Sequence, residues 1–159
     1  MRRLALVAGA VLGAGGLAVL VSSFAFGAGT SGTEQFTIFA GANGSGSVLA
    51  SGVFAAGGKD VQVTPNLDRF VFSQGTLLVA HRTTANHDRF SPATCVANLS
   101  ETGVYQITGT GGLAGATGHG TYVLHGTVIG PHTAAGCSQT ATGVGTIVVH
   151  ASGPFSLGG

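Results

Sequence analysis

From about residue 30 onward, apolar and polar side chains alternate along the chain with a period of two. The segment LDRFVFSQG at positions 67–75 shows this clearly, because Phe70 and Phe72 fall on one face and Val71 on the other. Short β-prone segments that end at glycine or proline are typical of strands. The pattern predicts seven or eight strands, over residues 35–39, 48–54, 59–63, 67–75, 76–83, 96–108, 120–129 and 143–151.

The connections between these strands are short or polar. Gln74 and Gly75 form a tight turn, so the strands on either side of it are predicted to pair as a hairpin. A polar loop, TANHDRFSPAT at 84–94, is predicted before the next strand. Beyond the N-terminus no long segment has apolar residues at helical spacing, and each glycine in a helix costs about 1 kcal/mol relative to alanine. We therefore expect an almost entirely antiparallel β fold.

Strands with one apolar face bury it either by closing into a barrel or by stacking as a sandwich. Glycines inside strands permit the bulges and tight coiling that a small barrel requires. Such glycines occur at Gly52, Gly103, Gly120, Gly126 and Gly145. The sequence favours an all-β fold, a small antiparallel β-barrel of about eight strands, with a β-sandwich as the alternative.

Composition removes several classes of protein. The 159 residues include 29 glycines, are 44% hydrophobic and only 7% charged, and carry a net charge of +1. The glycines lack the G-X-Y period of collagen, and the apolar content is too high for a disordered chain. The few basic side chains beyond Arg3 are scattered among acidic ones, so nucleic acid is not expected as a partner.

The first 28 residues have the layout of a secretory signal peptide. Arg2 and Arg3 precede an uncharged apolar run with small residues at its end, as such peptides do. We predict cleavage near Ala25 to Ala28, a secreted protein and a single domain over residues 29–159. The alternative is a retained anchor, because about 20 apolar residues are enough to span a bilayer. A membrane would then be contacted only through this segment.

The chain has two cysteines, Cys95 and Cys137. An even number in an exported protein predicts a disulfide, and a closed loop of about 43 residues would stabilise the fold by roughly 4 kcal/mol on the chain-entropy model. Two buried thiols or a half-built metal site are the alternatives. No CxxC motif or cysteine–histidine cluster at zinc spacing accompanies the pair, which favours the disulfide.

Residues with catalytic chemistry are few. Histidines stand at positions 81, 87, 119, 125, 132 and 150. None belongs to a metal motif, so exposed or hydrogen-bonded strand positions account for them unless pairing across strands builds a site. His87, Asp88 and Ser91 are triad residue types without a Gly-x-Ser-x-Gly elbow, and the glycine-rich segment 41–46 lacks the lysine of a phosphate loop. We assign no catalytic, cofactor-binding or metal-ligating residue and expect no cofactor.

The glycine-rich tract at 105–122, YQITGTGGLAGATGHGTY, resembles a turn of secreted actinobacterial proteins with an allene oxide cyclase-like or dirigent-like β-barrel. The Phe-x-Phe and Gly-Thr-Leu pattern at 70–77, SPATC at 91–95 and ETGVY at 101–105 fit the same family, so the resemblance covers about residues 65–150. Two positions depart from the family pattern. Gly112 stands where a basic residue is usual and Leu113 where an aromatic one is usual.

The resemblance implies a closed barrel with an apolar interior. In the plant relatives such a cavity confines a substrate, either for cyclisation of an unsaturated fatty-acid epoxide or for radical coupling of phenols. The functional residues of those relatives do not carry over, because Glu101 and Arg82 share only a residue type with them.

Three functions follow as expectations. The first is a secreted, non-catalytic barrel that binds a small apolar ligand in a cavity. A structural or cell-surface-associated protein, with a filled core and contact with the cell-wall surface, is one alternative. A barrel-type cyclase or isomerase is the other, and it requires an ionisable group inside the cavity.

Overall fold

The computed structural model describes residues 29–138 and 143–158. The predicted signal peptide, residues 1–28, lies outside the described residues and stays a prediction. The elements are β1 (Ser31–Gly41), β2 (Gly46–Ser51), β3 (Ala56–Thr64), β4 (Leu67–Phe72), β5 (Gly75–Asn86), β6 (Arg89–Ser91), β7 (Val96–Thr110), the 3-10 turn η1 (Gly111–Leu113), β8 (Thr117–Ile129), β9 (His132–Thr133), β10 (Gly136–Cys137) and β11 (Val144–Ser156). No helix within the described ranges is long and apolar enough to cross a membrane.

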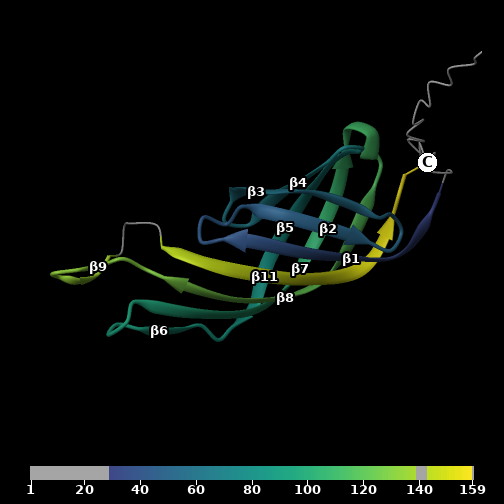
Figure 1. Cartoon of the computed structure of the whole chain (residues 1–159). Helices are drawn as coiled ribbons and strands as arrows, with labels where there is room; N and C mark the ends of the chain where they lie inside the picture. The colour runs from purple at the N-terminus through teal and green to yellow at the C-terminus, as the bar shows by residue number, and fades with distance from the viewer. Residues whose placement is uncertain (1–28, 139–142, 159) are drawn as a thin grey trace, which may run out of the picture.

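Eight of the strands in the described ranges close into an antiparallel barrel (Figure 1). The order around the barrel is β1, β2, β3, β4, β5, β7, β8 and β11, and β11 pairs with β1. The β5–β7 ladder, which runs from the Thr76–Thr110 pair to the Asn86–Glu101 pair, is the one that a sandwich would lack. The structure therefore confirms the barrel and excludes the β-sandwich, because each barrel strand has a neighbour on both sides.

Each predicted strand segment overlaps one barrel strand, although those over 48–54 and 67–75 extend past the ends of β2 and β4. The predicted hairpin is formed by β4 and β5, whose closing pair is Phe72 and Gly75. The loop predicted over 84–94 is wrong in part. β5 continues to Asn86, and β6 pairs with β7 through Phe90 and Ala97, because backbone pairing with β7 continues despite the polar side chains. Gly52 was also predicted inside a strand, but it follows the end of β2 with a φ of +141°.

The packed core fills the end of the barrel that η1 covers. The Phe54 and Phe72 rings meet edge-on with centroids 5.4 Å apart, and the Phe155 centroid lies 5.7 Å from that of Phe54. Leu113 of η1, 2% exposed, and the buried Ala116 close this end. The glycine-rich tract therefore forms the turn that closes this end of the barrel.

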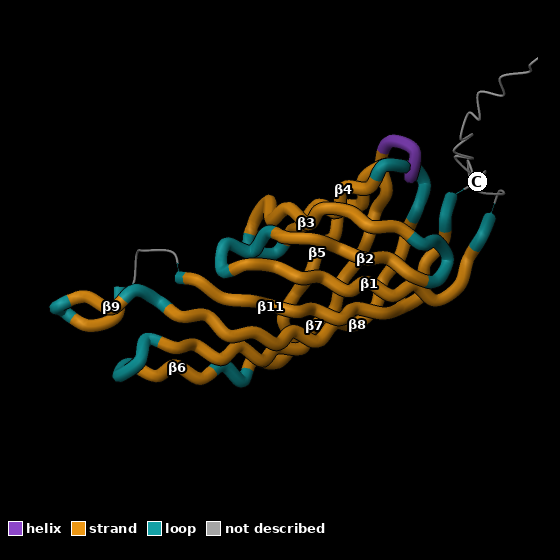
Figure 2. Tube along the Cα trace, in the orientation of Figure 1, coloured by secondary structure: helices purple, strands orange, loops and turns teal. Residues whose placement is uncertain are grey.

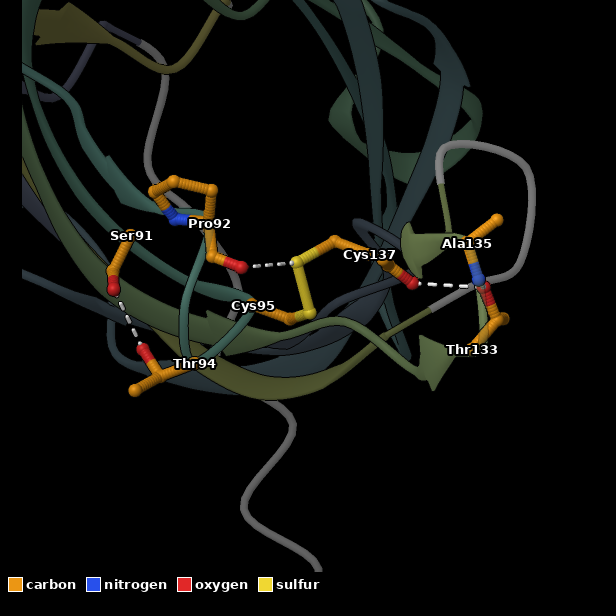
Figure 3. The surroundings of a disulfide bond; sticks show 8 residues. Ser91, Pro92, Thr94, Cys95, Thr133, Ala135 and Cys137 are labelled. Atoms are coloured by element: carbon orange, nitrogen blue, oxygen red, sulfur yellow. Dashed lines mark hydrogen bonds between the residues drawn. A yellow bond between two sulfur atoms is a disulfide. The ribbon is translucent and has the colours of Figure 1, made fainter.

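Three strands run on past the other end of the barrel. β7, β8 and β11 form an extension that carries β6 and the β9–β10 hairpin (Figure 2). The disulfide between Cys95 and Cys137 is confirmed, and it joins the turn before β7 to this hairpin (Figure 3). It is therefore a cross-link at the tip of the extension, away from the packed core.

Tyrosine and glycine face each other across the β7–β8 ladder inside the barrel. The pairs are Tyr105 with Gly120 and Tyr122 with Gly103. A Cβ on Gly103 would overlap the Tyr122 ring, and one on Gly120 would lie 2.8 Å from the Tyr105 hydroxyl. Each glycine thus leaves space for the tyrosine opposite, so the absence of a side chain at Gly103 and Gly120 lets both tyrosines pack inside the barrel.

Gly120→Ala is expected to lower the free energy of unfolding by about 2 to 3 kcal/mol, because the added methyl group overpacks a filled site. The new Cβ would overlap the backbone carbonyl oxygen of Ser152 as well as crowd Tyr105, and a backbone atom cannot move aside as a flexible side chain can. Gly57→Ala is the matched control, since the nearest atom to its Cβ is Leu49 Cδ2 at 3.7 Å. Equal denaturant midpoints for the two variants would contradict this account.

Candidate functional site

A cavity of about 150 Å³ lies inside the barrel, between the packed core and the β1–β2 turn. Its wall is mainly apolar and comes from strands all around the barrel: Phe36, Ile38, Phe70, Val79, Ile107 and Val149 line it. Gly44 of the β1–β2 turn and the exposed Gln62 line its outer end. The cavity therefore reaches solvent at the end of the barrel opposite η1.

Asp60 of β3 lines this cavity and is only 6% exposed. Its Oδ1 atom is enclosed and has no hydrogen-bond partner among the described residues. Burial and, to a smaller extent, the nearby charge of Asp68 raise the pKa of the Asp60 carboxyl to about 7, against the opposing effect of His81. Both forms of the carboxyl are therefore populated at neutral pH, so Asp60 is able to accept or to donate a proton there.

Asp68 of β4 and His81 of β5 form an ion pair beside Asp60. Their Oδ2 and Nε2 atoms lie 3.1 Å apart, and both side chains are about one-fifth exposed. The ring N–H does not point at the oxygen, so the contact is an ion pair rather than a well-aligned hydrogen bond. The proximity of Asp68 nevertheless raises the pKa of His81, against the opposing effect of burial.

Next to His81, a chain of hydrogen bonds links β5, β7 and β8. The Thr83 hydroxyl donates to Glu101 Oε2 at 3.0 Å and lies 3.0 Å from the Tyr122 hydroxyl, which donates to it. The Tyr122 ring meets the His81 ring edge-on, with centroids 5.9 Å apart. These contacts hold Glu101 and Tyr122 in place, and both of these residues line the cavity.

A second buried carboxylate lies deeper in the barrel. Glu34 of β1 is 0% exposed, and its Oε2 accepts a hydrogen bond from the Phe54 backbone N–H at 3.1 Å. Burial raises the pKa of Glu34, while backbone hydrogen bonds, that from Phe54 above all, lower it. Burial, with the added charge of Glu34, raises the pKa of Tyr105 to about 12. Glu34 fixes the turn after β2 by these bonds and does not line the cavity.

Within the described residues, no three histidine, cysteine or carboxylate side chains are placed to hold a metal ion. The chemistry available in the cavity is that of a buried carboxyl, an imidazole–carboxylate pair and two phenols above an apolar floor. This arrangement is suited to bind a small apolar molecule and to exchange a proton or a hydrogen bond with its polar group.

Of the residues singled out in the sequence, some line the cavity and others lie outside it. The disulfide cysteines lie on the extension and do not line the cavity. Of the histidines that we considered for pairing across strands, His81 faces the cavity, whereas His119, His125 and His150 are exposed. His87 and Asp88 are exposed in the turn before β6, and the segment 41–46 is the β1–β2 turn.

Sequence reasoning assigned no cavity residue, although a signal existed for several of them. Asp68 shares its strand face with Phe70, and His81 shares its own with Val79, both of which are buried. Glu34 likewise has the same parity as the buried Phe36. A polar residue in phase with buried apolar neighbours is the pattern that predicts an interior ionisable group.

Comparisons with protein-family models, with curated proteins and with solved structures find no significant match to this chain. The resemblance to allene oxide cyclase-like and dirigent-like barrels therefore stays a prediction.

Proposed function

We propose that this protein is a secreted binding protein that holds a small, largely apolar ligand in the open end of its barrel. The observation that carries the proposal is the cavity of about 150 Å³, which is walled by apolar side chains and reaches solvent at the β1–β2 turn. Ligand pockets are concave, mainly apolar and equipped with a few convergent polar groups. The Cys95–Cys137 disulfide supports export, because such bonds persist in oxidising compartments.

Filling the cavity is expected to abolish binding. Val149 of β11 lines the cavity, so Val149→Phe places a ring in the space that the ligand would take. We expect this variant to lower the affinity for 3-phenylpropan-1-ol, a small neutral apolar probe, by about ten-fold or more in calorimetric titration, because the ring removes the buried contact area.

Val148→Phe is the matched control for this experiment. Val148 is the neighbouring residue and does not line the cavity, since successive side chains of a strand face opposite sides. Its affinity for the probe should equal that of the parent protein. Equal affinities of the parent protein, Val149→Phe and Val148→Phe for the probe would show that the probe binds outside the cavity.

A barrel-type cyclase or isomerase is the second candidate. One observation favours it. Catalysis of this kind requires at least one ionisable group in the cavity, and Asp60 and His81 both line it. Catalysis differs from binding by turnover, so a bound compound would change its NMR spectrum with time while keeping its mass. The alternative of a structural or cell-surface protein stays a prediction that no observation favours.

A further inference from the structure

The carboxylates of the cavity differ in what they contact. Asp68 is paired with His81, and Glu101 accepts a hydrogen bond from Thr83. Asp60 is the most buried of the three, yet its Oδ1 has no partner in the described part of the chain. A buried polar atom without a partner destabilises the folded protein, and more so when it is charged. Asp60 is therefore the group that a bound molecule would satisfy.

The cavity is also unbalanced in charge. Three carboxyl groups, those of Asp60, Asp68 and Glu101, line it beside the single imidazole of His81, and no lysine or arginine is among the described residues of its wall. With His81 protonated and paired to Asp68, the two remaining carboxylates are unmatched by any positive charge. A ligand with a positive charge would restore the balance, whereas an anionic ligand would worsen it.

We propose that the cavity takes a small apolar molecule that carries a protonated amine, with the ammonium group placed against Asp60. The inference rests on the proposed binding function and names the ligand class. The apolar body of the ligand lies against the floor formed by residues such as Ile38 and Val149. The ammonium group donates hydrogen bonds to the Asp60 carboxylate, a charge-assisted contact roughly twice as strong as a neutral one.

Aromatic rings around the cavity favour the same ligand class. Phe36 and Phe70 contact each other with centroids 5.6 Å apart, and both line the cavity together with Tyr105 and Tyr122. The faces of such rings attract cations, and the attraction increases where water is excluded. A neutral alcohol retains the apolar contacts without the charge. For a carboxylate, His81 is the one cationic group among the described residues of the wall, and it is already paired with Asp68.

Three compounds with the same phenyl and three-carbon skeleton test the inference: 3-phenylpropylamine, 3-phenylpropan-1-ol and 3-phenylpropanoate. Their affinities for the purified protein are compared by calorimetric titration at pH 8, where the amine is protonated and Asp60 is mainly ionised. We expect the amine to bind about ten-fold or more tightly than the alcohol, and the carboxylate to bind more weakly than either.

Asp60→Asn keeps the shape of the side chain and removes its charge. It should lower the affinity for the amine by about ten-fold or more and leave that for the alcohol within about two-fold. Asp88→Asn removes the same charge from an exposed turn outside the cavity and should change neither affinity. Both variants should retain the far-ultraviolet circular dichroism spectrum of the parent, which shows that a lower affinity does not result from unfolding.

The outcomes separate the two proposals. If the alcohol binds as tightly as the amine, or if Asp60→Asn leaves the amine affinity unchanged, the amine assignment is overturned while the binding cavity stands. Tightest binding of the carboxylate likewise overturns it and assigns recognition to His81. If none of the three compounds binds, the binding function falls together with the inference.

Discussion

Asp60→Asn is expected to stabilise the unliganded protein by about 4 kcal/mol more at pH 8 than at pH 4. The reason is the cost of a buried charge. The Asp60 side chain is 6% exposed, and burial raises its pKa from 3.8 to about 7 in the folded protein. An asparagine at this position cannot ionise, so the variant does not carry the cost that the parent bears at alkaline pH.

The pH window follows from the two pKa values. In the unfolded chain the Asp60 carboxyl loses its proton near its model value of 3.8, whereas in the folded protein it retains the proton up to about pH 7. Between these values the folded state binds more protons than the unfolded state, so the parent protein becomes less stable as the pH rises. Above pH 7 the difference in stability between parent and variant should level off.

Denaturant unfolding of parent and variant between pH 4 and pH 8 measures this difference. Comparing the two proteins at each pH reports the Asp60 charge together with its effect on His81, whose pKa that charge raises. Asp88→Asn removes the same formal charge from an exposed side chain and controls for net charge. A stability difference between parent and Asp60→Asn that is flat across this range would show that the carboxyl is hydrated in the folded protein.

A residue that destabilises the empty protein at neutral pH needs a reason to be there. Stability-reducing groups concentrate at functional sites, where a ligand supplies the missing partner. An ammonium ion against Asp60 would supply that partner and lower its pKa, so the same carboxylate that costs free energy in the empty barrel would contribute to binding. The predicted gain in stability and the predicted loss of amine affinity in one variant are two consequences of one buried charge.

The strands follow from local alternation, which is why the barrel was predictable. Phe70 and Phe72 were placed on one face, and both are buried. The same parity extends to Asp68, and from Val79 to His81, so part of the cavity was within reach of the pattern. What remained hidden is which of these polar residues meet, since that depends on strand register between β4, β5 and β7.

β3 shows why the most important cavity residue could not be predicted. In KDVQV the alternation favours Val61 and Val63 as the inward residues, yet Val63 is 49% exposed and Asp60 is buried. The register of β3 against β2 and β4 places Asp60 opposite Gly46 and opposite Phe70, which is buried in the barrel. Tertiary pairing therefore overrides the hydrophobic pattern here, as expected where function competes with packing.

Loss of the Cys95–Cys137 disulfide is expected to lower the free energy of unfolding by about 4 kcal/mol, the chain-entropy value for a loop of this size. The two cysteines are 42 residues apart in sequence. Between them lie the β7–β8 hairpin and the β9–β10 hairpin, so the bond restricts a long unfolded segment. In the folded state, ladders to β5 and β11 hold β7 and β8 independently of the bond.

Because the bond acts mainly on the unfolded chain, the double variant Cys95→Ser/Cys137→Ser should unfold at a lower denaturant concentration yet retain the barrel and its affinity for 3-phenylpropan-1-ol. The cysteines lie on the extension, outside the cavity wall, which is why binding should be spared. Adding a reducing agent should destabilise the parent to the level of the variant and leave the variant unchanged. Coincident unfolding curves for parent and variant would instead mean that the unfolded segment between the cysteines is already compact without the cross-link.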